Sequence, residues 1–318
     1  MRKRLILNKI HTKDSAKRPL CLSITRAVSY IEDTYEQKGA SSHLEYTEAL
    51  AEAAARALEL WDLYGLLATT PTKLLEIKQQ HWKRRARCRH SRYPGKEFEK
   101  YPIDLLTPSS VNYIDSAPQD ALIAALATEQ FQLAGQMAEN GVSAIERSPA
   151  FGMPLQIAAA KGAEEFVRTV LKSCRITDAG DNSAAASKLA KAPRSVLLGA
   201  AEAGHLNIVQ NTLQEYKEDE QNLSTGLSLS IYSAVRHDNE AIALLLLQYR
   251  SPISERGRVR WTPERMMRIE LEFWRYLVRE ATKHNLKEVL KIALATVERL
   301  TVLSCLKGDG KGSTPVTV

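Results

Sequence analysis

Apolar residues recur at helical spacing through the first third of the chain. Behind Ser23, which is placed to cap a helix, apolar positions follow the i, i+3, i+4 and i+7 pattern of one helical face. These positions are Ile24, Ala27, Val28 and Ile31. A long stretch rich in Ala and Leu then opens at Ser42 and Glu45, which have the spacing of a capping box. The pattern predicts a helical N-terminal region over residues 1–93.

Residues 94–118 break this pattern because they contain Pro94, Pro102, Pro108 and Pro118. Proline lacks the backbone N–H that a helix interior needs, and it disfavours the helical conformation of the residue before it. The segment is therefore predicted to be a linker, and it is the best candidate for a domain boundary. We expect the helices before it either to cap the region after it or to form a separate module.

Beyond the linker the chain repeats itself. Residues 154–171 and residues 197–213 each contain a pair of alanines, then a glycine three positions after the pair, then a pair of large apolar residues. The alanine pairs are Ala158-Ala159 and Ala200-Ala201, and the glycines are Gly162 and Gly204. This order predicts a short helix, a tight turn at the glycine and a second helix.

These residues resemble the ankyrin repeat, whose two helices and intervening turn read TPLHLAAxxGHxxIVxLLL. Fainter copies of the frame flank the two clear ones. The first positions of the small-residue pairs are 124, 158, 200, 233 and 280, so the steps are 34, 42, 33 and 47 residues. Two steps match the ankyrin period of about 33 residues, and the excess in the others falls in residues 178–193 and 250–263, which we expect to form loops. About five degenerate repeats are thus expected over residues 119–305, followed by a flexible tail over residues 306–318.

The resemblance implies an all-α fold, namely an ankyrin-like helical repeat solenoid with an additional helical N-terminal region. A single helical hairpin cannot cover its own apolar face, so successive hairpins stack. The family's Thr-Pro becomes Met153-Pro154 in the first clear repeat, and its inner-helix His is missing throughout. The Thr–His hydrogen bonds of consensus repeats are therefore absent, and we expect a softer array.

The resemblance also implies a non-catalytic scaffold or adaptor that binds protein partners through a concave face, with no small-molecule substrate. Carried over position by position, it predicts contacts from residues after the small pairs and from the tip of one inter-repeat loop. These residues are Glu146, Arg147, Lys161, Glu202, Arg236 and Lys283. The plain alternative for each is a solvent-exposed side chain without a partner.

The formal charge of +7 is concentrated near the N-terminus. Residues 1–115 hold 20 basic and 14 acidic side chains, which leaves 44 − 20 = 24 basic and 37 − 14 = 23 acidic side chains in the remainder. Much of the excess comes from six positive residues between 83 and 92, namely Lys83, Arg84, Arg85, Arg87, Arg89 and Arg92. With Trp82 and Tyr93 available to stack on bases, this cluster suits nucleic-acid binding, which is the alternative function. A nuclear localisation signal, a solvated helix and a contact with an acidic protein are also open.

Other chemistry finds little support in the sequence. The chain contains no HExxH, no GxSxG and no complete Walker A motif, so we expect neither an enzyme nor a cofactor. His81, Cys88 and His90 lack a fourth metal ligand at suitable spacing, so no metal site is expected. Four scattered cysteines predict reduced thiols and a cytoplasmic or nuclear protein. The longest apolar run, 241–247, is too short to cross a membrane, and Asp14 argues against a mitochondrial presequence.

Overall fold

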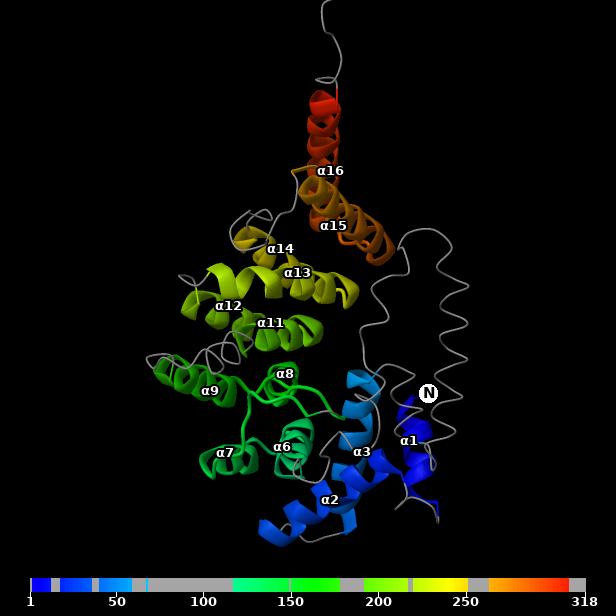
Figure 1. Cartoon of the computed structure of the whole chain (residues 1–318), viewed down its shortest axis with the longest axis vertical. Helices are drawn as coiled ribbons and strands as arrows, with labels where there is room; N and C mark the ends of the chain where they lie inside the picture. The colour runs from blue at the N-terminus through cyan, green and yellow to red at the C-terminus, as the bar shows by residue number, and fades with distance from the viewer. Residues whose placement is uncertain are drawn as a thin grey trace, which may run out of the picture. The chain divides into compact units, whose positions relative to one another are not determined.

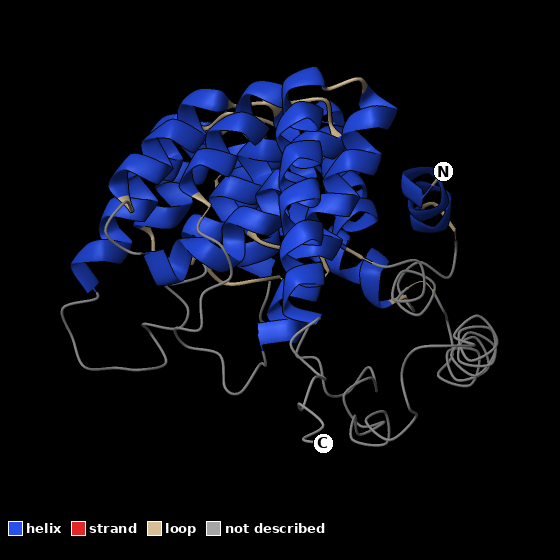
Figure 2. Ribbon diagram, turned by 90° about the horizontal axis from the view of Figure 1, so that it is seen from above, coloured by secondary structure: helices blue, strands red, loops and turns tan. Residues whose placement is uncertain are grey.

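The computed structural model describes residues 2–12, 18–35, 40–58, 67, 117–148, 150–177, 192–216, 220–250 and 263–308. Within these ranges the fold is all-α, which confirms the predicted class (Figures 1 and 2). The one extended pairing in the described residues is an isolated bridge between Ser148 and Gly152.

Thirteen helices lie in the described residues. In chain order they are α1 (Arg2–Ile10), α2 (Pro19–Thr34), α3 (Ala40–Ala57), α6 (Ala117–Ala127), α7 (Phe131–Glu139), α8 (Pro154–Ala160), α9 (Glu164–Thr177), α11 (Ala192–Ala203), α12 (Leu206–Glu215), α13 (Glu220–Arg236), α14 (Glu240–Tyr249), α15 (Pro263–His284) and α16 (Lys287–Gly308). The chain divides into two compact units, Met1–Asp181 and Asn182–Val318.

Several predicted boundaries need correction. Helix α2 begins at Pro19, whose missing N–H costs nothing in the first turn, so Ser23 lies buried inside the helix and does not cap it. Helix α3 begins at Ala40, so Ser42 lies within its first turn and not at the N-cap, and Glu45 lies in its second turn. The last two residues of the predicted linker, 117–118, form the start of α6, and the first three of the predicted tail, 306–308, belong to α16. The rest of both segments lies outside the described residues.

Ten of the helices form five hairpins that close with the same turn. The first helices are α6, α8, α11, α13 and α15, and the second helices are α7, α9, α12, α14 and α16. In each turn one residue has a positive φ between 56° and 87°. These residues are Glu129, Gly162, Gly204, Asp238 and Asn285. The left-handed residue reverses the chain directly after the first helix, as in a Schellman motif.

The residue after each left-handed position donates its N–H to an alanine carbonyl five residues back, at an N···O distance of 2.9 or 3.0 Å. The acceptors are Ala125, Ala158, Ala200, Ala234 and Ala281. All five alanines are fully buried. A small side chain here lets the neighbouring helix approach while the carbonyl remains available to the turn.

The acceptor alanines give the register of the repeat. They are separated by 33, 42, 34 and 47 residues. The frame inferred from the sequence is therefore one residue early at 124, 233 and 280. The left-handed residues of those three hairpins are Glu129, Asp238 and Asn285, so no glycine marks the position of the turn in their sequences.

Within each unit, neighbouring hairpins pack first helix on first helix and second helix on second helix. In the first unit α6 packs on α8 and α7 on α9. In the second unit α13 lies between α11 and α15, and α14 contacts both α12 and α16. The hairpins of each unit thus form a layer of first helices and a layer of second helices.

The N-terminal helices belong to the first unit and cover its first hairpin. Helices α2 and α3 both pack on α6, and α1 packs on α3. The buried face of α2 includes Ile24, Val28 and Ile31, the residues whose spacing predicted this helix. Tyr46 of α3, which is fully buried, donates its hydroxyl to the Gln130 side chain in the α6–α7 turn. The N-terminal helices therefore pack against the first hairpin of this unit.

Replacing Gly204 by Ala is expected to destabilise the protein by about 2–3 kcal/mol. A left-handed conformation costs an L-residue about 1–2 kcal/mol. At Gly204 the added Cβ would also lie 2.9 Å from Asn239 Oδ1, and moving that side chain gives up hydrogen bonds worth about 1 kcal/mol.

The matched control is Gly141→Ala. Gly141 has a φ of 89°, close to the 87° of Gly204, but nothing lies within 4 Å of its Cβ position. Urea unfolding followed by circular dichroism should show the smaller loss, about 1–2 kcal/mol, for the control. Equal losses would mean that Asn239 does not restrict the Gly204 turn.

Candidate functional site

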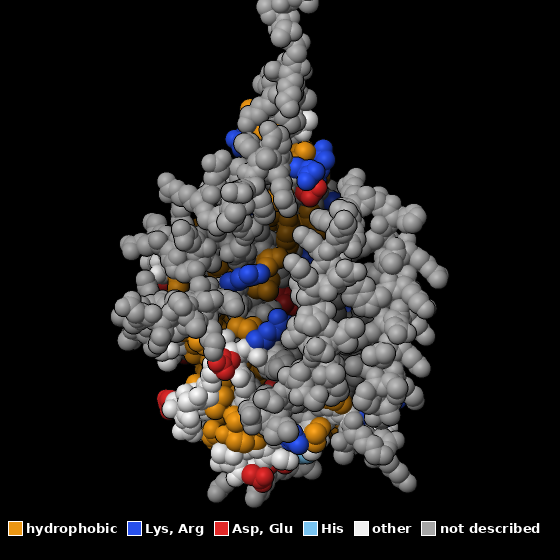
Figure 3. Space-filling view, in the orientation of Figure 1, with side chains coloured by type: hydrophobic (Ala, Val, Ile, Leu, Met, Phe, Trp, Pro, Cys, Tyr) orange, Lys and Arg blue, Asp and Glu red, His pale blue; other side chains and the backbone are white. Residues whose placement is uncertain are grey.

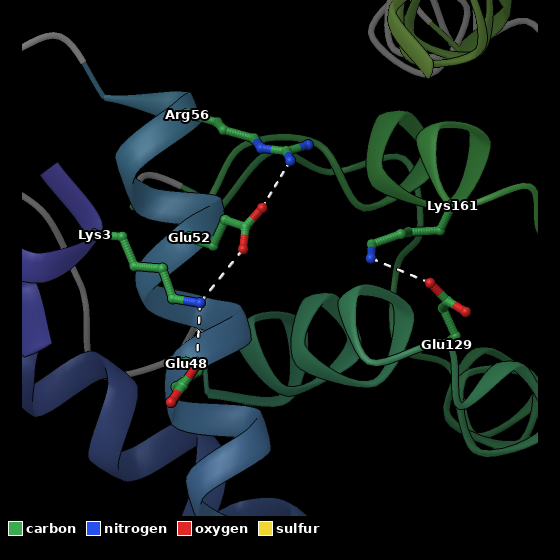
Figure 4. Close-up of polar contacts among 6 residues, drawn as sticks. All are labelled: Lys3, Glu48, Glu52, Arg56, Glu129 and Lys161. Carbon is green, nitrogen blue, oxygen red and sulfur yellow. Dashed lines mark hydrogen bonds and ion pairs between the residues drawn. The ribbon is translucent and has the colours of Figure 1, made fainter. Parts of the chain in front are cut away.

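The predicted contact residue Lys161 links two consecutive hairpin turns in the first unit. It lies directly after α8, and its Nζ is 3.2 Å from Oε1 of Glu129, the left-handed residue of the α6–α7 turn (Figure 4). The Glu129 side chain is 61% exposed and that of Lys161 is 35% exposed. Because such an exposed pair is weak, a partner carboxylate is able to compete for Lys161.

The turns of the second unit are also linked to one another. Asn239 Nδ2 donates to the carbonyl oxygens of Ala201, at 2.8 Å, and Glu202, at 3.3 Å, and so joins the α13–α14 turn to the end of α11. Asp238 Oδ1 lies 2.6 Å from Nδ1 of His284 at the end of α15. The ends of three successive first helices are therefore held side by side.

Three predicted contact residues lie at these helix ends. Glu202, Arg236 and Lys283 occupy the last turns of α11, α13 and α15. Arg236 is exposed, and its side chain has no partner among the residues described. Lys283 is 65% exposed, with its Nζ 3.7 Å from Oε2 of Glu280. The structure thus brings Glu202, Arg236 and Lys283 to one end of the first-helix layer of the second unit.

The other two predicted residues, Glu146 and Arg147, are exposed in the loop between α7 and α8. The side chain of Gln119, in the first turns of α6, holds this loop at its base. Its Nε2 donates to the carbonyl oxygens of Ser143, at 3.0 Å, and of Glu146. The Arg147 side chain has no partner in the part of the chain that the structure describes.

A buried hydrogen-bond centre fixes the far side of the same loop. Ser148 Oγ donates to Asp120 Oδ1 at 2.6 Å and accepts the N–H groups of Ala150 and Phe151 at 3.3 and 3.2 Å. Ser148 and Asp120 are each 1% exposed. Since hydrogen bonds that involve a carboxylate are stronger than neutral ones, this centre gives the loop a defined shape.

Lys3, near the N-terminus, is engaged by acidic residues of α3. Lys3 Nζ lies 3.1 Å from Glu48 Oε2 and 3.6 Å from Glu52 Oε2, and Arg56 Nη2 contacts the second oxygen of Glu52 at 2.7 Å (Figure 4). The hydrogen bond to Glu48 raises the pKa of Lys3 above its usual value. Part of the N-terminal positive charge is therefore balanced inside the protein.

Sequence reasoning missed a buried cation in the second unit. Arg250, which follows α14, places Nη2 2.8 Å from Oε1 of Glu270 in α15, with the two side chains only 5% and 11% exposed. The guanidinium carbon lies 3.9 Å from the ring centroid of Phe273 and 5.6 Å from that of Trp274. The pair clamps the end of α14 to α15.

Tyr232 of α13 completes this cluster. Its ring centroid is 5.0 Å from that of Phe273 and 4.4 Å from that of Tyr276. Burial raises the pKa of Tyr232 to about 12. The available sequence signal was the Phe-Trp-Arg-Tyr run at 273–276, three aromatic residues within four positions of a chain with few aromatics.

The remaining predictions concern charge, metals and membranes. The basic cluster 83–92 and the candidate ligands His81, Cys88 and His90 lie outside the described residues. Among the residues that are described, no group of three or more His, Cys, Asp or Glu side chains is placed to hold a metal ion. No helix in the same ranges is both long and apolar enough to cross a membrane. Charged side chains lie next to apolar ones on the face in Figure 3.

Comparisons of the chain with protein-family models, with curated proteins and with solved structures found no match.

Breaking the buried ion pair from one side is expected to be costly. The Arg250→Met variant should lose about 3–5 kcal/mol of unfolding free energy because it leaves the buried Glu270 carboxylate without its cation. The Arg250→Met/Glu270→Met double variant should recover most of this loss, since no buried charge remains. Urea unfolding measures both values.

The control is Arg279→Met, because the Arg279 side chain is 70% exposed. It should change stability by no more than about 0.5 kcal/mol. A double variant as unstable as Arg250→Met would show that the cluster depends on something other than this charge pair.

Tyr232 should make unfolding depend on alkaline pH. In the unfolded chain the tyrosine ionises near pH 10, whereas the folded protein holds the proton up to about pH 12. Its contribution to stability is therefore complete below pH 10 and lost as the pH rises toward 12. Between pH 9 and 11 the wild type should lose more unfolding free energy than Tyr232→Phe. Parallel losses in urea titrations would refute a raised pKa at this residue.

Proposed function

We propose that this protein is a non-catalytic scaffold or adaptor, built from ankyrin-like helical hairpins, that binds other proteins. The observation that carries the proposal is the recurrence of one turn in five hairpins, each with a left-handed residue and a hydrogen bond to a buried alanine. Repetition of one helical hairpin is the mark of repeat proteins, whose exposed helix ends and loops serve as extended binding surfaces.

The ankyrin resemblance supports this interpretation at two levels. In the α8–α9 and α11–α12 hairpins, the first alanine of the pair that carries the resemblance is the hydrogen-bond acceptor of the turn. The glycine that carries it is the left-handed residue of the same turn. The steps of 33 and 34 residues between acceptor alanines agree with the ankyrin period of about 33. In this proposal the five hairpins form a single solenoid with a concave binding face.

Two surfaces are the proposed contacts. One is the end of the first-helix layer in the second unit, where Glu202, Arg236 and Lys283 lie on neighbouring helices. The other is the α7–α8 loop with Glu146 and Arg147. Asp120 and Ser148 hold this loop in a defined shape, so little ordering entropy is lost when a partner binds there.

The test uses the full chain immobilised on beads, with Arg236→Glu and Arg147→Glu as contact variants. Charge reversal of an exposed contact should reduce retention of a partner by about tenfold or more, which corresponds to about 1.4 kcal/mol. The proteins that each immobilised variant retains are quantified by mass spectrometry, and samples treated with nuclease are compared with untreated samples.

Matched controls reverse an exposed charge on a second helix of the same unit. Arg299→Glu in α16 controls for Arg236→Glu, and Lys172→Glu in α9 controls for Arg147→Glu. Equal retention by all four variants would contradict the proposed surfaces. Retention that requires nucleic acid, and disappears in Arg84→Gln/Arg85→Gln/Arg87→Gln, would favour the alternative of binding through residues 83–92.

A further inference from the structure

The exposed face of α15 carries a row of positive charge. Four basic residues lie on it at intervals of seven, four and four positions, namely Arg268, Arg275, Arg279 and Lys283. We call these four residues the α15 strip. Because residues three, four and seven apart share one helical face, the four side chains lie on one face, and at about 1.5 Å per residue the row is about 22 Å long.

The strip has few anions of its own. Glu280 is 13% exposed and serves two members, with Oε1 3.1 Å from Arg279 Nε and Oε2 3.7 Å from Lys283 Nζ. Arg268 and Arg275 have no ion-pair partner in the described part of the chain, and the exposed Glu272 lies between them. The strip therefore keeps a positive excess.

This arrangement works against the stability of the helix. Like charges four positions apart, as in Arg275–Arg279 and Arg279–Lys283, repel one another and destabilise the helix. On the adjacent helix α16, Lys291 pairs with Glu288 at 4.0 Å. Arg268 and Arg275 of α15 have no such pair among the described residues, so the repulsion within the strip is only partly balanced.

We infer that the α15 strip binds an acidic segment of a partner protein. The inference rests on the proposed function for the class of partner and adds the chemistry that the partner must present. Residues four apart on a helix are spaced by about 6 Å, as are carboxylates at i, i+4 of a helical segment. Alternate residues of an extended segment are spaced by about 6.6 Å. Guanidinium groups bind such carboxylates through paired hydrogen bonds.

A protein segment fits the strip better than a nucleic acid. Glu272 stands between Arg268 and Arg275, where it would repel the phosphates of a polynucleotide that follows the row. A peptide is able to place a hydrogen-bond donor or a lysine at that point. The half-buried Tyr276 lies next to the strip, with the guanidinium carbon of Arg279 5.1 Å from its ring centroid, and it offers an apolar contact to side chains between the acidic residues.

The experiment measures fluorescence anisotropy of a labelled peptide of five Glu-Ala-Ala-Ala repeats, at about 50 and about 200 mM salt. The full chain carries Arg84→Gln, Arg85→Gln and Arg87→Gln in every sample, which removes half of the positive charge of the 83–92 cluster and keeps the remainder constant. Two triple variants are compared in this background. The α15 variant carries Arg275→Gln/Arg279→Gln/Lys283→Gln, and the α16 variant, with the same change in charge, carries Lys287→Gln/Lys291→Gln/Arg299→Gln. A peptide with Gln in place of every Glu and a labelled oligothymidine are the other probes.

The Glu peptide should bind the background protein and the α16 variant equally, and the α15 variant at least about tenfold more weakly. The Gln peptide should not bind. Absence of saturable binding at the lower salt, or equal losses in the two triple variants, would overturn the inference. Tighter binding of oligothymidine through the same three residues would replace it with a nucleic-acid site. The contact variants Arg147→Glu and Arg236→Glu lie outside the strip, so failure here and failure of the proposed function remain distinguishable.

Discussion

The hydrogen bond from the turn back to a buried alanine carbonyl is the interaction on which the hairpins depend. It has the same donor and acceptor positions in all five hairpins, and it forms only when the residue before the donor takes a left-handed conformation. The carbonyl sits on the buried face of the first helix, where an orphaned acceptor would be expensive. The turn therefore satisfies a polar group inside the core and sets the direction of the second helix in one step. Packing of first helices on each other is then possible, because the acceptor residue is small.

Side chains join one turn to the next. Lys161 reaches back to Glu129, Asn239 reaches back to the carbonyls at the end of α11, and His284 contacts Asp238. These links are local and at least partly accessible to solvent, in contrast to the Arg250–Glu270 pair, which is buried against aromatic rings. The side-chain links between turns align the turns but add little to the free energy of unfolding. The buried pair fixes the end of α14 on α15 and tolerates little change, because a buried charge without its counterion is costly.

The sequence was informative where a residue type reports a backbone state directly. Gly162 and Gly204 revealed two turns because glycine is the usual left-handed residue, and the all-α class was predictable from apolar spacing. Glu129 occupies the same backbone state but gives no signal, since glutamate is an ordinary helix residue, and the frame there was set one position early. The Arg250–Glu270 pair could not be predicted either, because its partners are 20 residues apart on separate elements. The proposed contacts were reachable only through the family resemblance, and their exposure says where they lie but not what they bind.

The α7–α8 loop separates the groups that give it shape from the group at its tip. Its conformation is set at the base of the loop by Gln119 and Ser148, which bond to its backbone, and by Asp120, which accepts the Ser148 hydroxyl. The Arg147 side chain takes no part in those bonds. A residue in that position is free to vary through evolution without loss of the surrounding geometry. In the proposed scaffold role, the loop is accordingly a natural place for recognition to diversify, and a convenient one at which to graft a new specificity.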